Sequence, residues 1–156
     1  MDASTLSLRA ARVEDLAAVV ALHAADAIGG HGDAWSDETR AGYHAAFARM
    51  QATPGHTLYV AEAGGQIVGT FVLSILPGIT ERGLTLAVVR SVQVAAASRS
   101  QGIGARMMEL AEDFAREAGA GRIELSSNLK REDAHRFYER IGYVRSHAGF
   151  KKKLAP

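Results

Sequence analysis

Residues 98–107, Ser-Arg-Ser-Gln-Gly-Ile-Gly-Ala-Arg-Met, place an arginine and two glycines at the start of a helical pattern. Gly102 and Gly104 have no side chains that would keep a phosphate from the backbone. The first turn of a helix adds free amide groups and a partial positive charge, and Arg99 adds a full charge. These residues suit a pyrophosphate, but a strand-to-helix turn in which glycine only relieves backbone strain would contain them too.

The loop fits neither of two common nucleotide-binding patterns. A dinucleotide fold places Gly-x-Gly-x-x-Gly after its first strand, with an acidic residue about 20 residues later. Here Met107 stands where the third glycine would be, and the loop lies in the middle of the chain. The Lys-Ser/Thr pair of a nucleotide P-loop is absent as well.

The elements that must position this loop alternate between strand and helix patterns. Strands are predicted at residues 5–11, 57–76 (two strands joined by a tight turn at Gly64-Gly65), 84–96, 122–127, 142–147 and 149–154. Helices are predicted at 16–27, 36–50 with Ser36 as N-cap, 103–118 and 131–140, and residues 28–33 break the first of them. This order predicts one α/β domain over residues 1–156, with a mixed, mostly antiparallel sheet of about six to seven strands and about four helices.

Composition narrows the function classes. A chain of 156 residues with 47% hydrophobic and 22% charged residues is typical of one soluble domain, expected in the cytoplasm. The net charge of +1 argues against a dedicated nucleic-acid binder, and we expect no membrane partner because no apolar run is long enough to span a bilayer. No cysteine is present, and the six histidines are scattered, so we expect neither a thiol nucleophile nor a metal site.

Two segments together resemble a known superfamily. The strand pattern containing Val92–Val94, then Arg-x-x-Gly-x-Gly and a helix, resembles the acetyl-CoA-binding motif of the GNAT N-acetyltransferases. Residues 124–154 resemble its second signature: Asn128 ending a strand, Tyr138 in the next helix, and Gly142-Tyr143 opening another strand. The order of elements agrees over nearly the whole chain. The second segment is most similar to a branch that includes small-amine and aminoalkylphosphonate acetyltransferases.

The resemblance implies a V-shaped splay between central strands, in which the pantetheine arm of acetyl-CoA pairs with backbone. That backbone would be supplied by Val92, Gln93 and Val94. The pyrophosphate would lie on Arg99, Ser100, Gln101, Gly102, Ile103 and Gly104. Asn128 would hold the pantetheine amide from the other side.

Tyr138 would lie near the thioester sulfur, and its chemistry suits that place. When an amine attacks the acetyl carbonyl, coenzyme A leaves as a thiolate. A thiol has a pKa near 8.5 and a phenol near 10, so a protonated tyrosine can donate to the departing sulfur at neutral pH. The alternative is that Phe137 and Tyr138 only pack their helix. Without a cysteine, direct transfer in a ternary complex is expected.

The general base is harder to identify. An alkylamine with a pKa near 10.4 costs about 4.6 kcal/mol to deprotonate at pH 7. Many relatives carry a carboxylate on the strand before the loop, but here residues 88–91 are Val-Val-Arg-Ser. Weak candidates for the base are Glu81, His31 and Asp33. Arg90 would suit an anionic substrate or a surface ion pair.

Several other residues have two interpretations. Trp35 is either a wall of the acceptor pocket or a staple on the second helix. His135 is expected on the exposed side of its helix, and His147 has no predicted direction. Lys151–Lys153 fit solvated lysines on an edge strand.

The sequence therefore predicts an acetyl-CoA-dependent N-acetyltransferase acting on a small primary amine. A protein N-terminal or lysine acetyltransferase is the alternative enzyme. The alternative that is not an enzyme is a regulator that binds acyl-CoA without catalysis. The missing strand carboxylate favours this alternative, and the presence of Tyr138 argues against it. The sequence leaves undecided whether the chain forms a homodimer through its C-terminal strands.

Overall fold

The computed structural model describes residues 6–28 and 31–154. Its contacts divide the chain into two compact units, Met1–Leu125 and Ser126–Pro156. Thr5, at the start of the first predicted strand, and Gly29-Gly30, in the predicted break after the first helix, lie outside the described residues.

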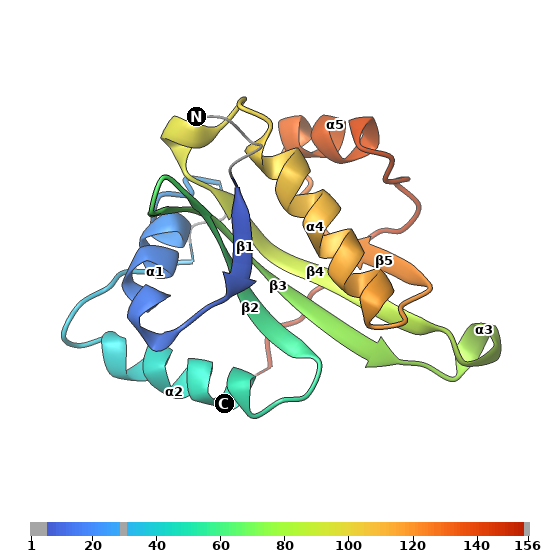
Figure 1. Ribbon diagram of the computed structural model, residues 1–156, viewed down its shortest axis with the longest axis horizontal. Coiled ribbons are helices and arrows are strands. Elements are labelled where there is room, and N and C mark those ends of the chain that lie inside the picture. Colours follow the sequence, from blue (N-terminus) through green and yellow to red (C-terminus); the bar gives the residue numbers. More distant parts are fainter. Residues whose placement is uncertain (1–5, 29–30, 155–156) are drawn as a thin grey trace. The chain divides into compact units, whose positions relative to one another are not determined.

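The first unit contains a five-stranded sheet in the order β1-β2-β3-β4-β5 (Figure 1). All neighbours are antiparallel except β4 and β5, which are parallel. The strands are β1 Ser7–Ala10, β2 His56–Ala63, β3 Gln66–Pro77, β4 Thr85–Val94 and β5 Arg122–Leu125. The prediction of a mixed, mostly antiparallel sheet is confirmed, but the strand count is lower than expected.

The turn between β2 and β3 follows from its two glycines. Gly64 and Gly65 have φ of 58° and 77°, and a two-residue turn with positive φ at both positions matches the right-handed twist of a hairpin. The predicted tight turn at Gly64-Gly65 is therefore confirmed.

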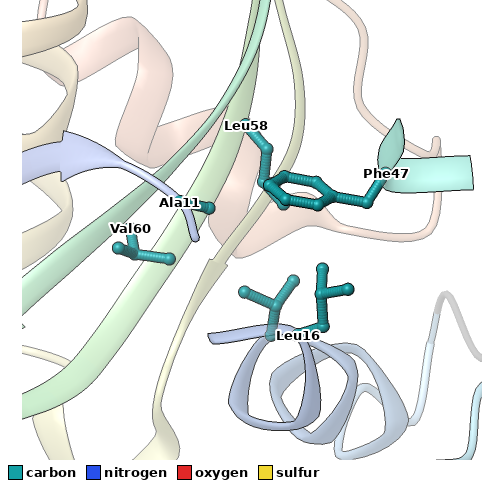
Figure 2. Packing of buried hydrophobic residues seen from close by; sticks show 6 residues of the cluster. Ala11, Leu16, Phe47, Leu58 and Val60 are labelled. Atoms are coloured by element: carbon teal, nitrogen blue, oxygen red, sulfur yellow. The ribbon is translucent and has the colours of Figure 1, made fainter. Parts of the chain in front are cut away.

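Helices cover both faces of the sheet in this unit. The helices are α1 Leu16–Ala24, α2 Arg40–Gln51, the one-turn α3 Thr80–Gly83 and α4 Ile103–Glu117, with 3-10 turns η2 Val13–Asp15 and η3 Ala96–Ser98. Leu58 of β2 packs with Leu16 and Phe47 from the first two helices (Figure 2). Neighbouring residues on a strand point to opposite faces, and Tyr59 stacks on Phe114 of α4 with ring centroids 5.0 Å apart. Thus α1 and α2 lie on one face and α4 on the other.

The long helix α4 approaches the sheet closely. Its buried side is formed by Ile103, Met107, Met108, Ala111 and Ala115. A Cβ at Gly69 of β3 would lie 2.5 Å from Met107 Sδ. Glycine at this position is what allows the helix to pack so near β3.

Two helix boundaries differ from the predictions. The first helix ends at Ala24 instead of residue 27. The second begins at Arg40, because Ser36 forms a separate turn in which its carbonyl accepts from the amides of Thr39 and Arg40. Ser36 is thus not the N-cap.

The second unit contains α5 Glu132–Arg140. The predicted closing strands at 142–147 and 149–154 are wrong, since residues 143–154 form neither strand nor helix. A strand needs a partner and buries one face, whereas Val144, Phe150 and Leu154 are 83%, 95% and 85% exposed. Alternating apolar residues alone therefore do not establish a strand here.

Within the described ranges, no helix is both long and apolar enough to cross a bilayer. The same residues contain no group of three acidic or histidine side chains placed to hold a metal ion.

Candidate functional site

Strand β4 extends past the end of its neighbour β5. The two strands pair from Leu86↔Arg122 to Val89↔Leu125. Beyond Val89, β4 continues to Val94, about 16 Å further at the usual rise per residue. In the described part of the chain, no strand pairs with β4 on that edge beyond Val89. The backbone of residues 90–94 is therefore available on that edge to pair with an extended ligand.

A β-bulge lies in the same stretch. Thr70 and Val72 of β3 face Gln93 and Arg90 of β4, so β4 carries one residue more than β3 between these pairs. Ser91 takes up the extra length with a φ of 55°, which non-glycine residues rarely adopt. A bulge bends its strand and increases the local twist, so β4 bends at the start of its unpaired end.

The glycine loop follows directly from the unpaired end of β4. Ser98 is buried, while Arg99, Ser100, Gln101 and Gly102 are exposed. The Arg99 Nε donates to the Val94 carbonyl at 3.1 Å, and Gln101 Nε2 donates to the Ala97 carbonyl at 2.8 Å. These bonds fold the loop back onto the strand and hold the Arg99 guanidinium beside its end.

The loop ends at the N-terminus of α4. Gly102 is the N-cap with φ 78° and ψ −4°, a left-handed conformation, and it provides no side-chain cap. Ile103 is 1% exposed and anchors the first turn, while Gly104 is half-buried. The first amide bonded back to the cap is that of Arg106, at 3.0 Å from the Gly102 carbonyl. The arrangement presents the first amides of a helix and a positive dipole end beside Arg99, which suits an anion.

The side chains of the strand residues add a feature that sequence reasoning missed. Val92 and Val94 are half-buried, but Gln93 is 8% exposed and its Nε2 donates to Asp26 Oδ2 at 2.8 Å. The resemblance implies a role for the backbone of Gln93 only, and no motif includes Asp26. The two residues are 67 positions apart, so no local pattern could reveal the contact.

The segment between α1 and α2 contains further titratable side chains. Tyr43 donates from its hydroxyl to Asp33 Oδ1 at 2.9 Å. Burial lowers the pKa of His23 at the end of α1, against the opposing effect of Asp33 and Asp26. His31 is exposed.

Trp35 lies at the end of this segment. It is stacked on Tyr43, with centroids 5.9 Å apart, and tilted against His44 at 5.7 Å. Both partners belong to α2. These contacts fit the interpretation of Trp35 as a staple on the second helix.

Glu81 lies far from the glycine loop. It precedes β4, whereas the loop follows it, so the ten residues of β4, about 30 Å, separate them. Its Oε1 accepts from Arg122 at 2.6 Å on the neighbouring strand. Glu81 is thus already paired, and it lies at the opposite end of β4 from the glycine loop. Arg90 is exposed within that end.

In the second unit, Asn128 organises the turn before α5. Its Oδ1 accepts from the Lys130 amide at 3.0 Å, and its carbonyl accepts from the Arg131 amide at 2.9 Å. His135 places Nε2 2.9 Å from the same carbonyl and is half-buried, so its expected position on the exposed side of the helix is only partly right. With Oδ1 engaged, the NH₂ of Asn128 is the part of this side chain suited to a ligand carbonyl.

Tyr138 is half-buried in α5 and meets Tyr143 edge-on, with centroids 5.9 Å apart. Burial raises the pKa of Tyr138, and the smaller effect of Arg131 lowers it. The phenol therefore keeps its proton at neutral pH, as a general acid must. His147 lies 2.7 Å from Ser146 Oγ, and both are exposed, as are Lys151–Lys153.

Comparison with known proteins places the chain in context. The model of the acetyltransferase (GNAT) family matches residues 16–143. A stretch of 56 residues is 55% identical to an aminoalkylphosphonate N-acetyltransferase of Salmonella typhimurium (strain LT2), and covers 36% of each chain. A stretch of 57 residues is 44% identical to the uncharacterized N-acetyltransferase YhdJ of Bacillus subtilis (strain 168), and covers 36% of this chain and 40% of that one. Each match thus spans little more than a third of the curated relative.

Among solved structures, a transcriptional regulator from Bacillus halodurans C-125 is 32% identical, with a TM-score of 0.90 over 96% of this chain and 99% of that chain. This likeness extends over nearly the full length of both proteins.

Proposed function

The chain belongs to the acetyltransferase (GNAT) family, a family of acyltransferases, and we propose that it transfers the acetyl group of acetyl-CoA to the primary amine of a small molecule. The observation that carries the proposal is the unpaired end of β4, residues 90–94, which leads directly into the glycine loop. An extended arm that pairs with backbone and ends in a pyrophosphate matches these two features in the order in which they occur.

The residues of the first unit fit acetyl-CoA as the donor substrate. The Ala95 amide donates to the Val68 carbonyl of β3 at 2.8 Å, so by alternation the backbone groups of Gln93 point to Thr70 of β3. Of the three residues predicted to pair with the pantetheine arm, Val92 and Val94 are thus the ones that offer pairing groups on the edge that β5 leaves open. The loop from Arg99 to Gly104 offers amides, a helix dipole and one guanidinium to the pyrophosphate. In this proposal the NH₂ of Asn128 donates to a carbonyl of the pantetheine arm.

The proposed chemistry is a direct transfer. The amine nitrogen attacks the acetyl carbonyl carbon, the resulting tetrahedral intermediate breaks its C–S bond, and the Tyr138 hydroxyl donates its proton to the departing sulfur. Tyr138 has this proton to donate at neutral pH, as a phenol with an ordinary or raised pKa does. The amine gives up its own proton to water or to a base.

A small amine is the favoured acceptor. The 55% identity to an aminoalkylphosphonate N-acetyltransferase supports it over a protein N-terminus or lysine. The exposed Arg90 in the unpaired end of β4 would suit an anionic group on such an amine.

A non-catalytic acyl-CoA-binding regulator is the second candidate. It is favoured by the full-length likeness to a protein described as a transcriptional regulator, and by the Val-Val-Arg-Ser sequence where many relatives carry a carboxylate. A regulator would bind acetyl-CoA without accelerating its breakdown by any amine.

Thermal unfolding followed by a thiol-release screen tests the proposal. Acetyl-CoA at 100 times its Kd should stabilise the fold by about 2.7 kcal/mol, a Tm increase of about 5 to 10 °C for this length, whereas ATP and NAD should not. A panel of amines, aminoalkylphosphonates included, should then release thiol from acetyl-CoA. Stabilisation without release by any amine favours the regulator, and no stabilisation refutes both functions.

A further inference from the structure

Glu124 lies on the strand beside β4, one residue before that strand ends (Figure 1). It is opposite Val88 in the parallel pairing, and Leu125, the last residue of β5, is opposite Val89. In the proposed function, the arm of acetyl-CoA runs from the glycine loop back along β4 towards Val89, where β5 occupies the edge. The thioester at the end of the arm would thus lie in line with β5, one or two residues beyond Glu124, roughly 3–7 Å away.

The side chain of Glu124 points to the face of the sheet on which α1 and α2 lie. Val72 of β3 packs against the hydrophobic cluster that contains Leu58 on this face, and it pairs with Arg90 of β4. Paired residues point to the same face, and so do residues two apart on one strand. Arg90, Val88 and Glu124 therefore share this face.

Around Glu124 this face is open to solvent, whereas the opposite face is filled. Arg90 is exposed, Val88 is half-buried and the Glu124 side chain is 46% exposed. On the face that α4 covers, Val89 is only 1% exposed. A small polar acceptor would therefore reach the thioester from the face to which Glu124 points.

Glu124 belongs to a group of charges in which carboxylates outnumber cations. Its Oε1 accepts from Arg122 Nε at 2.7 Å, and Nη1 of the same arginine donates to Glu81 at 2.6 Å. Two carboxylates thus share one guanidinium, which leaves a formal charge of −1 on the three side chains. The bond to Arg122 also holds the Glu124 carboxylate in place, and a carboxylate oxygen can accept more than one hydrogen bond. The group therefore suits an ammonium ion.

Another proton acceptor, His56, belongs to the same row of paired residues but lies further away. The row runs from His56 of β2 through Ser74 of β3 and Val88 of β4 to Glu124 of β5. At the usual spacing of strands, three strands place His56 about 14 Å from the line of β5. Of these two residues, Glu124 is the one beside the thioester.

We propose that Glu124 receives the ammonium group of the acceptor and accepts its proton. The proposal rests on the proposed function, and it puts on β5 the carboxylate that β4 lacks. One proton passes from the ammonium to Glu124, the freed nitrogen forms its bond to the acetyl carbon, and the C–S bond breaks. Glu124 then gives its proton to water. The second proton that the nitrogen loses replaces, through water, the proton that Tyr138 gives to the sulfur.

Arg90 defines where the other end of such an acceptor would lie. It is one strand across and two residues along from Glu124, so their Cα atoms are about 8 Å apart. Opposite charges at this spacing suit a small zwitterion that has its ammonium group at Glu124 and an anionic group at Arg90. Aminoalkylphosphonates have both groups.

The pH dependence of thiol release tests the role of Glu124. The acceptor is 2-aminoethylphosphonate, or another alkylamine if the screen selects one. In the wild type Glu124 takes the proton, so kcat/KM for the acceptor should change less than about threefold between pH 7 and pH 9. Glu124→Gln should lower kcat/KM about 100-fold at pH 7. Because this variant depends on amine that is already neutral in solution, its kcat/KM should rise about tenfold per pH unit and approach the wild type near pH 9.

Asp113→Asn is the matched control. Asp113 lies on α4, on the other face of the sheet, and its side chain is 55% exposed and 2.7 Å from Arg116. Its removal should leave kcat/KM and the pH profile unchanged. Both variants should melt within a few degrees of the wild type, because exposed ion pairs contribute little to stability. Both should also keep the Tm increase with acetyl-CoA.

The failures of the two proposals are distinguishable. If Glu124→Gln keeps the wild-type kcat/KM at pH 7, or loses the same factor at pH 7 and at pH 9, the role of Glu124 is refuted and the transferase stands. If acetyl-CoA does not raise the Tm, or raises it while no amine releases thiol, the proposed transfer is refuted and the role of Glu124 with it.

Discussion

Gly102 provides the sharpest test of the glycine loop. Its φ of 78° lies in the left-handed region, where an L-residue pays about 1–2 kcal/mol. Unfolding entropy of about 2.1 cal/mol/K per residue gives about 0.33 kcal/mol/K for this chain. Gly102→Ala should therefore lower the Tm by about 3–6 °C if the loop keeps its conformation.

If the loop instead relaxes to avoid the strain, the same substitution should weaken the binding of acetyl-CoA. Binding must then restore the native conformation, at the same cost of about 1–2 kcal/mol. That cost corresponds to about a 5- to 30-fold increase in Kd. Calorimetric titration of acetyl-CoA measures the Kd, and thermal unfolding without ligand measures the stability.

Gly65→Ala is the matched control. Gly65 has nearly the same φ, 77°, and a Cβ there would meet nothing within 4 Å. It lies in the β2–β3 turn, away from the loop. It should lower the Tm by a similar amount while leaving the Kd for acetyl-CoA unchanged. If Gly102→Ala changes neither the Tm nor the Kd, or if both variants weaken acetyl-CoA binding equally, the role of the loop geometry in binding the donor is refuted.

Three further predictions concern the mechanism, the pH dependence and the packing. Tyr138→Phe should lower turnover about tenfold or more while leaving acetyl-CoA affinity unchanged in steady-state and binding assays; unchanged turnover would remove Tyr138 from the mechanism. The Arg9 guanidinium, 2.6 Å away, holds the pKa of Asp15 below its usual 3.8, so its stabilisation is complete above that value and is lost as pH falls through the lowered pKa. Asp15→Asn should cost about 1.5–3 kcal/mol in urea unfolding at pH 7, with the difference closing at acid pH. Gly69→Ala should cost about 1–3 kcal/mol in the same assay, because its Cβ would overlap Met107; an unchanged midpoint would show that α4 shifts without cost.

Features set by neighbouring residues were predictable from the sequence. The Gly64-Gly65 hairpin, the helix after Gly102 and the helix ending at Arg140 all depend on local backbone preferences or on periodicity. The long strand predicted at 84–96 is β4, Thr85–Val94, whose β-branched residues are buried at Val89 and half-buried at Thr85, Val88, Val92 and Val94. In each case the local structure follows from residues that are close together in the sequence.

Features set by distant contacts were not predictable. The bond from Gln93 to Asp26 depends on how α1 lies on β4, and nothing near either residue indicates it. The closing strands were wrongly predicted for the same reason: the alternation around Val144 and Phe150 is real, but a strand also requires a partner edge that alternation cannot specify. Glu81 was a reasonable base by residue type and is excluded from the loop end of β4 only by its place in the topology.

The absence of a carboxylate on β4 does not by itself decide between an enzyme and a regulator. A general base contributes typically 10²–10⁴-fold, so its loss slows a transferase without abolishing transfer. An acceptor that binds with its amine already neutral would need no base. The protonation state of Tyr138 does not decide it either, because a phenol with an ordinary or raised pKa is protonated at neutral pH in an enzyme and in a regulator alike. Turnover by Tyr138→Phe, measured beside donor binding, therefore separates the two functions more directly than the search for a base.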